Sequence, residues 1–118
     1  MKIKGNVVVL TNGKLNTKSA KTAHGLIRGS KRFNVVAIID SSFTNKFVHI
    51  DKNGKIDLLD KKSDIPIYND MTSFLESSVN VDFCIIGVAS AGGLLPNEMR
   101  EDVILSLKSN ISIINGLH

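Results

Sequence analysis

The sequence has one cysteine, Cys84, no tryptophan and only two prolines among its 118 residues. A single cysteine excludes an internal disulfide and a zinc site built on cysteines, because both need partner thiols. Nine glycines and two prolines are also too few for a collagen-like or low-complexity chain. The chain must therefore be stabilised by a packed core, without covalent or metal cross-links of this kind.

Long apolar runs are missing as well. The longest charge-free stretch of mixed apolar character, Phe83–Leu95, contains a serine and three glycines, whereas a membrane helix needs about 20 apolar residues. Near the N-terminus only Val7–Leu10 follows the first lysines, which is too short for the core of a signal peptide. We therefore expect a cytoplasmic protein with reduced thiols and no membrane partner.

The remaining composition is that of a globular protein. Apolar residues make up 42% of the chain and charged residues 22%, which are ordinary values for a folded domain and not for a disordered chain. A chain of 118 residues is expected to form one domain and to bury about 65% of its unfolded surface.

Short continuous apolar runs recur along the chain and predict its strands. Continuous runs, unlike alternating ones, indicate strands covered on both faces, as in a parallel sheet between helical layers. The five predicted strands are Val7–Leu10, Val35–Ile39, Ile65–Tyr68, Phe83–Ile86 and Ile111–Ile114.

Helical spacing appears between these runs. A first helix is predicted from its apolar stripe and from the residues that would begin and end it, namely Ala20, Ala23 and Ile27 in the stripe, Thr17 or Ser19 as the cap and Gly29 at the end. A second helix is predicted over residues 71–75, with Asp70 as its N-cap. A third is predicted from Pro96 to about Lys108, with Met99, Val103 and Leu107 as its buried stripe and Asn110 in the left-handed closing position.

The alternation of strands and helices, with right-handed crossovers, predicts an α/β fold. We expect a Rossmann-like three-layer sandwich around a mostly parallel five-stranded sheet of order 3-2-1-4-5. Between residues 46 and 59, two β-prone runs flank Asn53-Gly54, a pair typical of a two-residue hairpin turn with positive φ at both positions. A β-hairpin insertion is therefore expected near 46–59, where a standard unit has its second helix.

Charge is distributed unevenly. Eight cations and no acid precede Asp40, and seven cations and eleven acids follow from that residue on. This asymmetry indicates either a solvated basic face or a small anionic ligand near the first strand and helix. Nucleic acid is disfavoured as a partner, because Phe33 is the only aromatic residue near these cations and one ring cannot form a stacking platform.

Ligands of open α/β sheets bind beyond the carboxyl ends of the strands. Three loops are expected at that edge: Thr11–Lys18, Asp40–Ser42 and Ala89–Leu95. The third contains Gly92-Gly93, which can turn successive N–H groups towards an anion. The first matches neither a dinucleotide fingerprint nor a P-loop, because Gly13 stands alone, so a plain turn and an anion site both stay open for it.

Two side chains have both a structural and a functional interpretation. Asp40 closes the second predicted strand, where a Rossmann acid holds ribose hydroxyls, but it also suits the start of a turn. His24 lies beside the apolar stripe of the first helix and fits either a packed histidine or an anion ligand. Cys84 is expected to be buried and inert, and neither a triad nor a metal-ligand pattern is recognisable.

We expect no metal site and name no catalytic residue. The candidate ligand- and anion-binding residues are Thr11, Asn12, Gly13, Lys21, His24, Arg28, Asp40, Ser90, Gly92, Gly93, Asn115 and His118.

Several stretches together resemble one family. They are Val9–Gly13, Lys21–Gly29, Val36–Asp40, Ile65–Tyr68, Ile86–Ala89 with Gly92-Gly93, and Asn115–His118. The chain resembles, over nearly its whole length, the N-terminal domain of the bacterial and archaeal family that includes D-glutamate N-acetyltransferase. The least similar part is residues 41–64.

The resemblance implies a two-domain protein, in which residues 1–118 form a Rossmann-like domain and a C-terminal P-loop domain, absent from this chain, is its partner. It also implies acetyl transfer from acetyl-CoA to the amine of D-glutamate, with the isolated domain inactive. A non-catalytic nucleotide- or CoA-binding module is the alternative. An NAD-dependent oxidoreductase is disfavoured because G-x-G-x-x-G is missing, and the sequence leaves a homo-oligomer open.

Overall fold

The apolar run at the start of the chain forms the central strand of the parallel part of a sheet. The structure, a computed structural model, describes residues 5–11, 13–15, 20–29, 32–43, 45–87 and 97–115. Strand β1 (Gly5–Leu10) carries Val7, Val8, Val9 and Leu10, all at most 1% exposed. Because consecutive side chains of a strand point to opposite faces, burial of all four requires cover on both faces.

The sheet has seven strands in the order β4-β3-β5-β2-β1-β6-β7. The other strands are β2 (Phe33–Ile39), β3 (Phe47–Ile50), β4 (Ile56–Leu59), β5 (Ile65–Tyr68), β6 (Phe83–Ile86) and β7 (Ser112–Asn115). All pairs among β5, β2, β1, β6 and β7 are parallel, and β3 is antiparallel to both β4 and β5. The five predicted strands thus take the predicted order 3-2-1-4-5, and the hairpin extends the sheet at the β5 edge.

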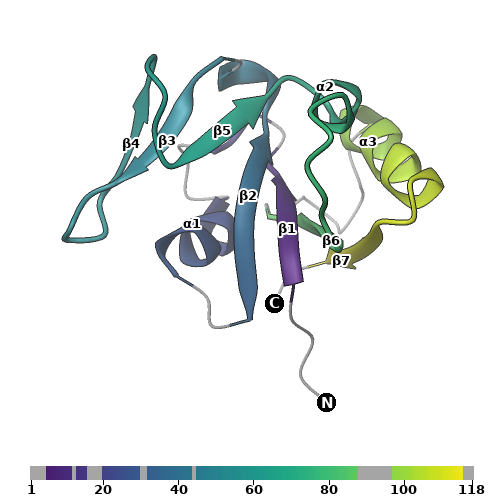
Figure 1. The fold of residues 1–118 in the computed structure, drawn as a ribbon, viewed down its shortest axis with the longest axis horizontal. Coiled ribbons are helices and arrows are strands. Elements are labelled where there is room, and N and C mark those ends of the chain that lie inside the picture. Colours follow the sequence, from purple (N-terminus) through teal and green to yellow (C-terminus); the bar gives the residue numbers. More distant parts are fainter. Residues whose placement is uncertain are drawn as a thin grey trace.

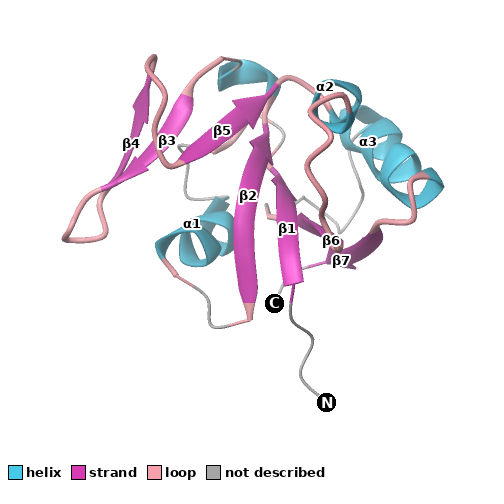
Figure 2. Cartoon of the chain, in the orientation of Figure 1, coloured by secondary structure: helices cyan, strands magenta, loops and turns pink. Residues whose placement is uncertain are grey.

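Helices cover the two faces of the sheet (Figures 1 and 2). Helix α1 (Lys21–Arg28) lies on the face where Val9 points, since an added Cβ at Gly87 would meet both Val9 and Ala23. Helices α2 (Met71–Leu75) and α3 (Asn97–Lys108) cover the opposite face, where Leu10 and Met99 line one cavity. This arrangement is a Rossmann-like α/β sandwich, as predicted, and no helix in the described part is long and apolar enough to cross a membrane.

Helix α1 begins differently from the prediction. Its N-cap is Ala20, whose side chain makes no capping hydrogen bond, and the expected caps Thr17 and Ser19 lie outside the described residues. An acceptor for the first turn comes instead from the residue after β6, because the N–H of Ala23 donates to the carbonyl of Gly87 at 3.3 Å. The predicted stripe of Ala20, Ala23 and Ile27 is buried and Gly29 ends the helix with φ 144°, as expected.

The hairpin forms where it was predicted, but its turn is of another kind. Only Gly54 has a positive φ, 81°, and Asn53 does not. The Asp51 carboxylate accepts the N–H groups of both Asn53 and Lys55 at 2.8 Å, and the Gly54 N–H donates to the Asp51 carbonyl at 3.0 Å. This is the three-residue loop that ends in a left-handed glycine bulge, so the two-residue turn was wrong.

Helix α3 ends at Lys108 as predicted, and Asn110 has φ 63°. Its buried stripe was partly wrong, however, because Leu107 is 57% exposed while Ser106 is fully buried. Residues seven apart on a helix differ in direction by about 20° and residues eight apart by about 80°. Ser106 therefore follows Met99 into the core, and its hydroxyl donates to the Asp102 carbonyl at 2.8 Å.

Candidate functional site

Parallel strands bring their carboxyl ends to one edge of the sheet, and the chain leaves that edge at Thr11, Asp40, Asn69 and Gly87. Among the residues predicted to bind a ligand, Thr11, Gly13 and Asp40 are brought together here. Gly13 has φ 77°, and an added Cβ would lie 3.0 Å from the Ser42 hydroxyl. The turn therefore favours glycine, as the sequence indicated.

Asp40 organises this edge. Its side chain is 1% exposed, and both carboxylate oxygens accept hydrogen bonds. The Thr11 hydroxyl donates to Oδ2 at 2.6 Å, the Leu15 N–H donates to the same oxygen at 3.2 Å, and the Ser42 N–H donates to Oδ1 at 2.9 Å. These bonds tie the loop after β1 to the end of β2, which is a structural role. Ribose binding by Asp40 stays a prediction.

His24 holds the same loop from the other side. Its Nε2 bonds to the carbonyl of Leu15, and because a carbonyl only accepts, the proton lies on Nε2. Leu15 is therefore fixed at its N–H by Asp40 and at its carbonyl by His24, and its side chain is 1% exposed. Two residues singled out as ligand candidates thus act together in positioning the loop.

The other predicted site residues either lie apart from this edge or are outside the residues that the structure describes. Lys21 and Arg28 are exposed at the two ends of α1, and Arg28 Nε donates to the Gly54 carbonyl at 3.1 Å. The backbone of Asn115 ends β7. Asn12, Ser90, Gly92, Gly93 and His118 lie outside the described residues, and so does the whole predicted loop Ala89–Leu95.

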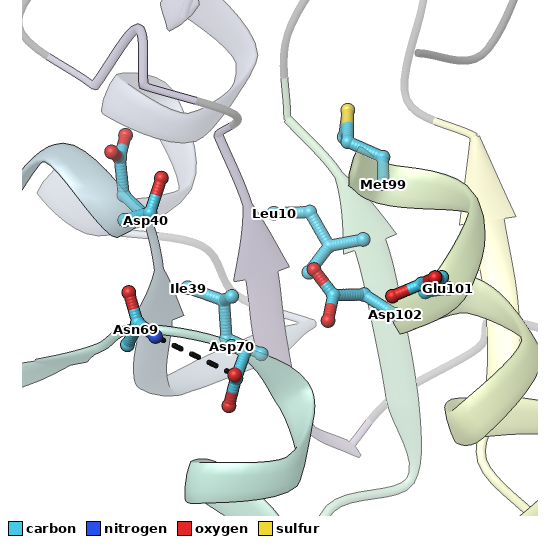
Figure 3. Close-up of a pocket in the computed structure, with 9 residues that line it drawn as sticks. Leu10, Ile39, Asp40, Asn69, Asp70, Met99, Glu101 and Asp102 are labelled. Atoms are coloured by element: carbon cyan, nitrogen blue, oxygen red, sulfur yellow. Dashed lines mark hydrogen bonds between the residues drawn. The ribbon is translucent and has the colours of Figure 1, made fainter. Parts of the chain in front are cut away.

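The described residues form a different crevice at the carboxyl edge, on the α2 and α3 side (Figure 3). It has a volume of about 250 Å³. Three apolar side chains line it together with six polar ones, four of them carboxylates: Leu10, Ile39, Met99, Asp40, Ser41, Asn69, Asp70, Glu101 and Asp102. In Figure 3 the Asp40 carboxyl group points away from Asn69 and Asp70, towards its own partners.

Asp70 and Asp102 converge on the first turn of α2. Asp70 is its N-cap, as predicted, and accepts the Ser73 N–H at 2.8 Å. Asp102 Oδ1 accepts the Met71 N–H at 2.9 Å, while its other oxygen has no hydrogen-bond partner among the described residues. Burial raises the pKa of Asp102, and the negative charges of Asp70 and Glu101 also raise it. The hydrogen bond from the Met71 N–H acts in the opposite direction but does not cancel these effects.

Sequence reasoning missed this crevice. Asp70 follows β5 at the same edge where Asp40 follows β2, so the rule that selected Asp40 would also have selected Asp70 as a site residue. Asp102 had no such signal, because its approach depends on how α3 packs against α2. Within the described ranges, no three His, Cys, Asp or Glu side chains are arranged to hold a metal ion, and burial raises the pKa of Cys84 to about 12.

Comparison with known proteins is consistent with this fold. The family model described as a domain of unknown function, DUF1611_N, Rossmann-like domain, matches residues 51–118. A crystal structure of a DUF1611 family protein from Anabaena variabilis superposes with a TM-score of 0.74 at 24% identity, covering 98% of this chain. The chain spans only 31% of that longer protein. No curated protein matches the chain.

Proposed function

This chain belongs to DUF1611_N, a family of Rossmann-like domains of unknown function, and from that premise we propose that it is the substrate-binding domain of a cytoplasmic N-acyltransferase. The acceptor would be the amine of an amino acid such as D-glutamate, and the acetyl donor would be acetyl-CoA. A C-terminal P-loop domain outside this chain would complete the site. The resemblance of Lys21–Gly29 and Asn115–His118 to the D-glutamate N-acetyltransferase family supports this proposal.

The observation that carries the proposal is the carboxylate crevice. Asp70, Glu101 and Asp102 line a cavity of about 250 Å³ at the carboxyl edge, where α/β sheets bind their ligands. Negative charge around a partly desolvated space attracts a positive group. The ammonium group of an amino acid suits this space better than a phosphate does.

Asp102 is the group we assign to the amine. Acyl transfer needs the neutral amine, whose nitrogen attacks the thioester carbonyl while the C–N bond forms and the C–S bond breaks. The ammonium group must first lose one proton to a base, and the leaving thiolate takes up the second proton, which the nitrogen loses as the amide forms. The Asp102 oxygen that has no partner among the described residues can accept a hydrogen bond from the ammonium group. A raised pKa makes this carboxylate a better acceptor of the ammonium proton.

The alternative, a non-catalytic nucleotide- or CoA-binding module, has less support from the described residues. The acid that would hold a ribose, Asp40, already accepts hydrogen bonds from Thr11, Leu15 and Ser42. An NAD-dependent oxidoreductase is disfavoured further, since only Gly13 occupies the phosphate-binding turn after β1.

Titration of the 118-residue chain with D-glutamate tests amine recognition, and glutarate, which lacks the amine, is the matched probe. D-Glutamate should shift the amide signals of Asp70, Met71 and Asp102 in NMR spectra, and glutarate should leave them in place. Asp102→Asn should weaken D-glutamate binding at least five-fold, whereas Glu76→Gln, which removes a charge at the far end of α2, should change it less than two-fold. Equal shifts with the two probes would refute amine recognition.

An activity assay tests the two-domain part of the proposal. A longer protein that includes the C-terminal domain should release CoA from acetyl-CoA in the presence of D-glutamate. The 118-residue chain should release none, because half of the site would be missing. Turnover by the 118-residue chain alone would contradict this division of the site, and binding without turnover by the longer protein would favour the non-catalytic module.

A further inference from the structure

A second cavity lies on the opposite side of the sheet, between α1 and the hairpin formed by β3 and β4. The hairpin lies on the same side of the sheet as α1 in Figure 1. Arg28, the last residue of the helix, donates from Nε to the Gly54 carbonyl of the hairpin turn at 3.1 Å. The cavity beside this contact is open to solvent and has a volume of about 250 Å³. It is lined by Leu15, His24, Arg28, Lys55, Ile56 and Leu58.

The lining divides into two kinds of side chain. Three are aliphatic and three are basic, and none carries a carboxylate. Arg28 uses Nε for the hairpin contact, so its two terminal nitrogens remain without a hydrogen bond among the described residues. A guanidinium group presents such nitrogens side by side, in the geometry that matches the two oxygens of a carboxylate.

Lys55 supplies a second cation from the hairpin. Its ammonium group lies near the Asp51 carboxylate, whose pKa is lowered chiefly by the hydrogen bond from the Lys55 N–H. Asp51 is not among the lining residues, and its oxygen is engaged with the backbone of the turn. Asp51 therefore reduces the field of Lys55 without occupying the cavity, and Arg28 is the main anion partner.

We infer that this cavity binds a small aliphatic carboxylate. The carboxylate group would contact Arg28 and Lys55, and the alkyl chain would lie against Leu15, Ile56 and Leu58. The volume is below the range of about 300–1,000 Å³ for drug-sized ligands, which excludes CoA or a dinucleotide as an enclosed ligand and suits an acid of a few carbon atoms. This inference concerns a separate cavity and does not depend on the amine crevice.

The cavity contains two of the residues predicted to bind an anion, His24 and Arg28. Sequence reasoning placed an anion near Lys21, His24 and Arg28 on the first helix, and the structure adds Lys55 from a segment that the sequence presented only as a hairpin. Because its two cations come from different elements, a bound carboxylate would cross-link α1 to the hairpin turn. Binding should therefore slow amide exchange at Lys55 and Ile56 as well as shift nearby signals.

Three probes separate the contributions in an NMR titration of the 118-residue chain. Butyrate carries both the charge and the alkyl chain, butyramide keeps the chain without the charge, and inorganic phosphate keeps charge without the chain. We expect butyrate to shift the amides of His24, Arg28 and Leu58 with a millimolar dissociation constant. Butyramide and phosphate should each bind at least five-fold more weakly.

Three variants test the location. Arg28→Gln should weaken butyrate binding at least five-fold, and Lys55→Gln, which leaves the Arg28–Gly54 contact in place, about three-fold. Lys62→Gln removes a lysine of the exposed loop after β4 and should change affinity less than two-fold. The inference is overturned by an absence of butyrate shifts at these amides, by equal binding of butyrate and butyramide, by phosphate binding as tightly as butyrate, or by equal effects of Arg28→Gln and Lys62→Gln.

Discussion

Replacing Thr11 by valine should show how much the loop after β1 depends on one buried hydrogen bond. Valine keeps the shape of threonine but removes the hydroxyl that donates to Asp40 Oδ2 at 2.6 Å, between side chains that are 0% and 1% exposed. A hydrogen bond to a charged group contributes about 1.5–3 kcal/mol. Because Oδ2 keeps the Leu15 N–H at 3.2 Å, no oxygen is left without a donor, and we expect a loss of about 2 kcal/mol.

Asp40→Ala should be more damaging, because it removes the acceptor of all three donors at once. The N–H groups of Leu15 and Ser42 would be left unpaired, and the Thr11 hydroxyl would keep only the Ile39 carbonyl, at 3.4 Å. This should lower the free energy of unfolding by about 4 kcal/mol, less than the sum of three separate losses because the loop can relax towards water. The comparison of the two variants separates the loss of one bond from the loss of the whole arrangement.

Urea unfolding at pH 7, followed by far-UV circular dichroism, measures both changes, since the chain has no tryptophan to report by fluorescence. Thr11→Ser keeps the hydroxyl and should lose less than about 1 kcal/mol. Thr72→Val makes the same isosteric change at an exposed position of α2 and should stay within about 0.5 kcal/mol. If Thr11→Val unfolds at the same urea concentration as these two controls, the hydroxyl does not stabilise the loop and the reasoning fails.

Three further predictions concern other parts of the fold. Gly87→Ala should destabilise the protein by about 1–3 kcal/mol in the same urea assay, because its Cβ would lie 2.5 Å from a Val9 methyl group; wild-type stability would show that α1 can move away. Gly54→Ala should lower the free energy of unfolding by about 1 kcal/mol or more, since alanine is strained at φ 81°. Asn53→Ala should introduce little backbone strain, because Asn53 has no positive φ; equal losses of stability in the two variants would support the two-residue turn. Cys84 should not react with iodoacetamide at pH 8 until urea unfolds the chain, because burial raises its pKa to about 12; labelling of the native protein at the rate of a free thiol would contradict its burial.

The strands were predictable because their signal is local. Runs such as Val7–Leu10 and Phe83–Ile86 are β-branched or apolar at every position, and only a strand covered on both faces buries such a run completely. The order of the strands followed from the handedness and shortness of connections. The cap at Asp70 and the left-handed Asn110 likewise depend on neighbours within a few residues.

Features that depend on residues distant in the chain could not be predicted from the sequence. The first turn of α1 depends on the Gly87 carbonyl, which accepts from the Ala23 N–H and lies more than 60 residues later in the chain. The exposure of Leu107 reflects the direction in which α3 packs. The candidate site shows the same division. Thr11, Gly13 and Asp40 were correctly expected at one edge, but the partners of Asp102 and the approach of Lys55 to Arg28 arise only when separate elements pack.

The position of β1 at the centre of the five parallel strands has a consequence for how the protein is made. On one side β1 pairs with β2, which follows closely in the sequence. On the other side it pairs with β6, where Phe83 lies opposite Val7 and Ile86 lies opposite Leu10. The hydrogen bond from the Asn6 N–H to the Asp82 carboxylate spans 76 residues. A chain emerging from the ribosome therefore holds this apolar strand with one open edge until β6 appears. During that interval Val7–Leu10 has the properties of a segment that aggregates, whereas the hairpin of β3 and β4 joins residues close in sequence and can form without waiting.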